Sequence, residues 1–138
     1  MTLDEAIRQL RTLNEPVPEP LRLPTPQEVS AVEQRLAVQF HPDFRKYLLE
    51  ASDIVFDGLE PVTITRPKSP TDLEVVCAQA WDEWEIPRRL LPICEDNGDY
   101  YCMNARGEII FWSHIGPSQE KWRDLATWIE QVWIGEAM

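Results

Sequence analysis

The stretch LLPICEDNGDYYCMNARGEIIFWSH, residues 90–114, decides the fold. It holds short apolar runs at 90–94, 100–103 and 109–112, separated by two turn signals. The first turn, residues 96–99, contains the pair Asn97-Gly98, which suits the positive φ angles of a tight hairpin. In the second, residues 104–107, Gly107 can take the left-handed position after a type I turn. The pattern predicts a three-stranded antiparallel meander.

Helices are expected ahead of this meander. Residues 2–5 and 25–28 both have the capping-box form, in which a threonine stands three residues ahead of a glutamate. Helices should therefore begin near Leu3 and Pro26, joined by the proline-rich, extended residues 15–24. A third helix should begin at Pro42. His41, at its start, is expected to help the helix begin or to pack rather than to catalyse.

The rest of the chain predicts four more elements. Residues 59–65 alternate and predict a strand, residues 69–72 open a helix that Pro87 stops, and residues 115–118 form a turn. The last helix should run from Asp124 to about Trp133. The predicted fold class is α+β: a mainly antiparallel sheet with a central three-stranded meander, flanked by N-terminal, middle and C-terminal helices.

Length and composition favour one domain, residues 1–138, in which residues 1–22 form the N-terminal helix and the proline-rich segment. No apolar run approaches the length that a bilayer span needs, and the first residues lack the pattern of a secretory signal. Three cysteines are too few and too uneven for a disulfide framework. These features predict a cytoplasmic protein.

The net charge of −11 is unevenly distributed. Residues 50–60 carry four acids and no base, and residues 72–100 carry eight acids against two arginines. A negative field repels nucleic acid and anionic membranes and attracts a basic partner. Plain solubility is the alternative explanation of the same charge.

The sequence shows no convincing active site, so we expect no catalytic residue, no cofactor and no metal. Glycine-rich phosphate loops, serine elbows and zinc-binding helices are all missing. Glu95, Asp96 and Asp99 have the composition of a calcium or glycosidase site, but acids at a hairpin tip are usually solvated. A nucleophilic pair of Cys102 and His114 is conceivable, without an oxyanion site to support it.

Acids interleave with two tryptophans at the end of the middle helix. Trp81 is expected to pack on the sheet. Trp84, beside Asp82 and Glu83, suits either packing or a protein-binding surface, because tryptophan supplies much of the energy at interfaces.

The order of features resembles the SUKH superfamily, which includes the yeast cell-wall-assembly regulator and many bacterial immunity proteins. The resemblance rests on residues 23–29, 42–49, 91–101, 107–114 and 125–129, and it extends over residues 23–134. It implies a non-enzymatic α+β protein that binds and neutralises a cognate toxin domain, often a nuclease. The basic groove of a nuclease would complement an acidic face.

The leading hypothesis is therefore an immunity protein that binds a basic toxin, with no direct contact to nucleic acid or membrane. The candidate partner-binding residues are Asp53, Asp57, Glu60, Asp82, Glu83, Trp84, Glu95, Asp96 and Asp99. The alternative is a general adaptor that uses a groove lined by Trp84 and Trp133. The chain is expected to be a monomer or a weak homodimer, the latter through exposed tryptophans near the C-terminus.

Overall fold

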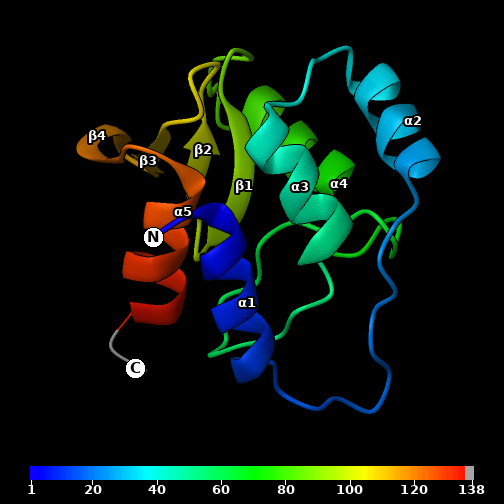
Figure 1. Cartoon of the computed structure of the whole chain (residues 1–138). Helices are drawn as coiled ribbons and strands as arrows, with labels where there is room; N and C mark the ends of the chain where they lie inside the picture. The colour runs from blue at the N-terminus through cyan, green and yellow to red at the C-terminus, as the bar shows by residue number, and fades with distance from the viewer. Residues whose placement is uncertain (136–138) are drawn as a thin grey trace.

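The computed structural model describes residues 1–135 (Figure 1). The helices are α1 (Leu3–Leu13), α2 (Pro26–Leu36), α3 (Pro42–Glu50), α4 (Leu73–Ala78) and α5 (Leu125–Trp128). The wider π-helical turns η1 (Gln79–Glu83) and η2 (Ile129–Ile134) continue α4 and α5. The strands are β1 (Leu91–Asp96), β2 (Asp99–Met103), β3 (Ile109–Ser113) and β4 (Gly116–Trp122). The predicted α+β class is confirmed.

The predicted meander is present and forms most of the sheet. The strand order is β1-β2-β3-β4 with every neighbouring pair antiparallel. Asn97 (φ 54°) and Gly98 (φ 89°) make the first turn, both with the positive φ that a two-residue hairpin needs. In the second turn Gly107 has φ 84° and donates its N–H to the Asn104 carbonyl oxygen.

Two predictions about strands are wrong. Of the turn expected at 115–118, Ile115 does lie in a turn, but residues 116–118 begin β4, a fourth strand that pairs with β3 at the sheet edge. Its residues are mostly polar and exposed, so they carry no alternating pattern. The strand expected at 59–65 forms only isolated bridges, because Pro61 and Val62 pair with β1 while Thr63 pairs with the segment before α4.

Helix starts follow the predicted caps. In both capping boxes the threonine hydroxyl accepts the N–H of the glutamate three residues on, and the glutamate side chain accepts the N–H of the threonine. Asp124 caps α5 as expected. The His41 Nδ1 accepts the Asp43 N–H at 3.1 Å, which confirms that His41 helps α3 begin. The middle helix begins at Leu73, and Pro70 lies in the turn before it.

Helices cover both faces of the sheet. On one face the Tyr101 ring packs edge-on against Trp128 of α5, at 5.3 Å between centroids. On the other face α4 packs against β1. The core between these layers includes Phe44, Leu48 and Trp133. In Figure 1, α5 lies to the left of β1 and α3 and α4 to its right, with α2 outermost at the right.

Buried tryptophans correct one further expectation. Trp128 and Trp133 are both nearly inaccessible, and the Trp133 indole N–H donates to the Phe56 carbonyl oxygen at 3.3 Å. The C-terminal tryptophans are therefore core residues and are not exposed for dimer formation. Trp81 is buried as expected, and its indole N–H donates to the Leu90 carbonyl oxygen at 2.9 Å.

Candidate protein-interaction surface

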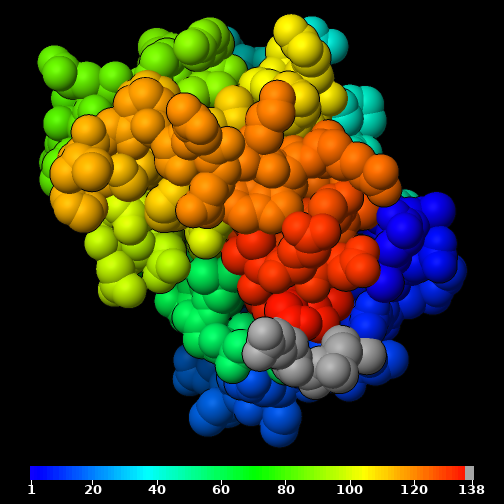
Figure 2. Space-filling model, turned by 90° about the vertical axis from the view of Figure 1, so that its left-hand side faces the viewer, coloured from blue at the N-terminus to red at the C-terminus, as the bar shows by residue number. Residues whose placement is uncertain are grey.

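The end of η1 and the tips of the sheet meet around a surface recess. The recess has a volume of about 240 Å³ and is lined by Trp84 and Glu85, by Gly98 and Tyr100, and by residues 112–116. The helix end and the hairpin, which the sequence suggested separately as binding sites, thus lie beside each other. Figure 2 looks onto the β4 side of the molecule, where the yellow-green β1–β2 tip lies below the light-orange β3–β4 turn.

The Trp84 side chain lies on this surface. It is 48% exposed, which decides between packing and a surface position. Asp82 and Glu83 beside it are exposed as well. The sequence did not single out Ile115, which is 88% exposed at the β3–β4 turn and lines the same recess. A large apolar residue in a tight turn is the only signal that pointed to it.

Asp99 is held by the neighbouring turn. One of its carboxylate oxygens accepts the His114 N–H at 2.8 Å and lies 3.0 Å from the His114 Nδ1. The hydrogen bond to the His114 side chain, with the one to its backbone, lowers the pKa of Asp99 from its ordinary value of 3.8. The two hairpin tips are therefore joined at this point, and Asp99 stays ionised.

Glu95 and Asp96 lie at the same tip. The Glu95 carboxylate accepts the Gly98 N–H at 2.8 Å and so closes the turn. Burial, together with the charges of Glu95 and Glu83, raises the pKa of Tyr100 to about 12.

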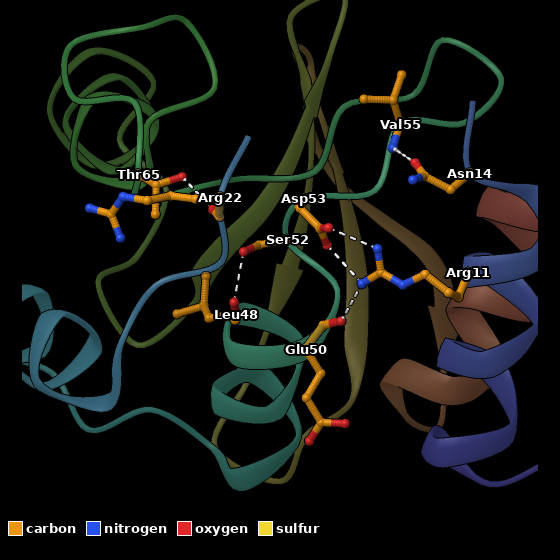
Figure 3. Close-up of polar contacts among 9 residues, drawn as sticks. All are labelled: Arg11, Asn14, Arg22, Leu48, Glu50, Ser52, Asp53, Val55 and Thr65. Atoms are coloured by element: carbon orange, nitrogen blue, oxygen red, sulfur yellow. Dashed lines mark hydrogen bonds and ion pairs between the residues drawn. The ribbon is translucent and has the colours of Figure 1, made fainter. Parts of the chain in front are cut away.

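The first acidic loop divides into two parts. Asp53 is bound by two hydrogen bonds from Arg11, each of 2.8 Å, so its charge is matched within the fold (Figure 3). Glu60 is exposed and precedes Pro61, which bridges Cys94 in antiparallel fashion, so Glu60 lies next to Glu95. Asp57 is exposed and has a left-handed backbone conformation, with φ 55°. Its N–H donates to the Glu15 carboxylate.

The Cys102–His114 pair that the sequence made conceivable is not assembled. Cys102 is fully buried, and burial raises the pKa of its thiol to about 12. His114 is exposed and bound to Asp99. The three cysteines are free and buried.

Within residues 1–135 no three His, Cys, Asp or Glu side chains are grouped so that they could hold a metal ion. Over the same residues, no helix combines the length and the apolar character that a membrane span requires.

Comparison with known proteins identifies the family. Residues 3–134 match the SUKH_5 family, described as SMI1-KNR4 cell-wall. The chain belongs to the SUKH superfamily. The match covers nearly the whole chain, including α1, which lies outside the region where the sequence alone showed the resemblance. Proteins of this superfamily are in general non-enzymatic and of the immunity type.

A crystal structure of a protein from Pseudomonas syringae pv. tomato has the same fold as this SUKH chain. The two are 43% identical with a TM-score of 0.90, and the match covers 95% of this chain and 98% of the other. A search of the curated proteins finds no match.

Proposed function

We propose that the protein is an immunity-type inhibitor that binds a basic toxin domain through an acidic face. The acidic face consists of eight of the nine residues singled out from the sequence: Asp57, Glu60, Asp82, Glu83, Trp84, Glu95, Asp96 and Asp99. Asp53 is excluded because Arg11 already neutralises it. No catalytic step is part of this proposal, and no cofactor is required for it.

The observation that carries the proposal is the recess between Trp84 and Ile115. Two large apolar side chains are exposed there. Glu85 lines the recess with them, and the exposed acids Asp82 and Glu83 directly precede Trp84 in the chain. Interfaces gain most of their energy from a few anchors of this kind, and tryptophan is among the commonest. The surrounding acids would select a partner with lysine or arginine around its own apolar centre.

The negative charge should also raise the rate of association with a basic partner. An inhibitor must reach its toxin before damage is done, and opposite charges raise the rate of association of two proteins. With a net charge of −11, the protein would be drawn towards the basic groove of a nuclease-type toxin. The nucleic acid itself would be repelled.

The first experiment is a tagged pull-down from the source cell in the cytoplasmic fraction, washed at low and then at high salt. We expect one stoichiometric basic partner that is released by salt. With that partner in hand, Asp82→Lys and Asp96→Lys should each slow association about tenfold at low salt. Glu130→Lys on η2 makes the same charge change outside the acidic face and should leave the rate unchanged. Equal rates for all three variants would refute the acidic face.

A second function remains open, that of a general adaptor without a toxin partner. The exposure of Trp84 and Ile115 favours it, because apolar anchors need no basic partner. The groove expected between Trp84 and Trp133 is not available, since Trp133 is buried. For an adaptor, binding would ignore salt and several partners would be lost together in Trp84→Ala. The inhibitor would instead have a single partner, and its binding to that partner would depend strongly on salt.

A further inference from the structure

A second groove lies at the end of the sheet opposite the acidic tip. Leu91 pairs with Met103 at this end, whereas Asp96 pairs with Asp99 at the other, about 17 Å away along the strands. Two recesses of about 480 and 400 Å³ adjoin here and share three lining residues. Together they form what we call the basic groove, lined by Val38–Pro42, Arg88–Leu91, Met103–Arg106, Ile110, Trp112 and Pro117.

The charge of the basic groove is opposite to that of the chain. Among residues 1–135, Arg88, Arg89 and Arg106 line it and no aspartate or glutamate does, although the protein has 24 acidic and 13 basic residues. None of the three arginines takes part in an ion pair within residues 1–135. Most other arginines there are paired with a carboxylate, such as Arg11 with Asp53 and Arg35 with Glu74. Three positive charges are thus left for a ligand.

The walls of the groove are held in place. The Arg88 guanidinium lies over the Trp81 ring, 4.3 Å from its centre, and donates to the Leu36 carbonyl oxygen at 3.1 Å. The His41 ring also lines the groove and packs against Gly107 so closely that a Cβ on Gly107 would lie 2.6 Å from Nε2. A site whose side chains are positioned before binding loses less entropy when a ligand arrives.

The groove also offers an apolar surface. Phe40, Leu91 and Met103 line one half, and Ile110, Trp112 and Pro117 line the other. A polyphosphate chain carries no apolar groups that could pack against these side chains. A peptide that alternates carboxylates and apolar side chains matches both features.

We propose that the basic groove binds an acidic, partly apolar peptide segment of a partner protein. The carboxylates of the segment pair with Arg88, Arg89 and Arg106, and arginine suits them because its fork can hold a carboxylate by two hydrogen bonds. The apolar side chains of the segment lie against Phe40, Met103 and Trp112. Trp112 lines both this groove and the recess beside Trp84, but the charged residues of the two sites are different, so either proposal can fail without the other.

The test uses the full chain and a fluorescein-labelled decapeptide of glutamate and leucine in equal numbers. A lysine–leucine peptide of the same length and a thymidine decanucleotide serve as competitors of other chemistry. Fluorescence anisotropy should show saturable binding of the acidic peptide. The double variant Arg89→Glu/Arg106→Glu should weaken it at least about tenfold, since two charges are reversed.

Two controls make the result decisive. Arg8 is exposed on α1, away from the groove, and Arg8→Glu should not change the affinity. Ala105 is exposed and lines both recesses, so Ala105→Glu should block the groove without removing an arginine. Circular dichroism establishes that each variant is folded, which their exposed positions favour.

Three results would overturn the proposal: no saturable binding of the acidic peptide, equal weakening by Arg8→Glu, or tighter binding of the oligonucleotide. A fourth result would also overturn it, by showing that the groove binds a second copy of the chain and not a partner protein. If the protein itself dimerises in light scattering, and both Arg89→Glu and Asp96→Lys abolish the dimer, the groove holds the acidic tip of a second copy.

Discussion

Arg11 of α1 donates two hydrogen bonds to the Asp53 carboxylate and a third, also of 2.8 Å, to the carbonyl oxygen of Glu50 at the end of α3. One guanidinium thus ties the N-terminal helix to the chain that leaves α3, 39 and 42 residues away in sequence. Figure 3 shows Arg11 extending from α1 towards Asp53 and the Glu50 carbonyl oxygen, with the three bonds meeting at its guanidinium group.

Replacement of this guanidinium should cost stability. We expect Arg11→Met to lower the free energy of unfolding by about 1 kcal/mol, the usual size for hydrogen bonds to a charged group at a partly exposed site. Urea denaturation measures the change. Arg8→Met on the same helix is the control, and an equal loss in both variants would show that the bonds to Asp53 contribute nothing.

The contact between Gly107 and His41 predicts a difference between two glycines. Gly98 and Gly107 have nearly the same positive φ, but a Cβ on Gly98 meets nothing within 4 Å. Gly98→Ala should therefore lower the free energy of unfolding only by the cost of placing alanine in a left-handed conformation, about 1–2 kcal/mol. Gly107→Ala should lose at least about 1 kcal/mol more, because the Cβ must displace the His41 ring. Thermal unfolding of the two variants tests this, and equal losses would contradict it.

The two tryptophans of the middle helix should behave oppositely. Trp81 is buried, hydrogen-bonded and covered by Arg88, so Trp81→Ala should destabilise the fold by about 3–5 kcal/mol. Trp84→Ala should cost less than about 1 kcal/mol, since the side chain is half exposed, yet it should abolish partner binding. Guanidinium unfolding and a binding assay measure both. A large loss of stability in Trp84→Ala would assign Trp84 to the core.

The hydrogen bonds between His114 and Asp99 predict how stability changes at low pH. Because the fold lowers the pKa of Asp99 below 3.8, the contribution of this carboxylate to stability is complete above that pH. It is lost as the pH falls through the lowered pKa.

In His114→Ala the backbone N–H still donates, so the pKa of Asp99 should rise only part of the way to its ordinary value. Carboxyl carbon shifts in an NMR titration measure it. An unchanged pKa would show that the side chain of His114 has no influence.

The local features of this protein were predictable from its sequence. Helix caps, the Asn97-Gly98 turn and the three apolar strands depend on residues within a few positions of one another, so the local sequence specifies them. The same holds for the SUKH resemblance, which follows the order of such features along the chain.

What only the tertiary structure decided involves residues that are distant in sequence. β4 has no apolar pattern and exists because β3 offers an edge, and Asp53 loses its role as a surface acid because Arg11 folds over it. The basic groove joins residues 38–42, 88–91 and 103–106, which have no common signal. Pairing across such separations depends on how helices and strands pack, and the packing is a property of the whole chain.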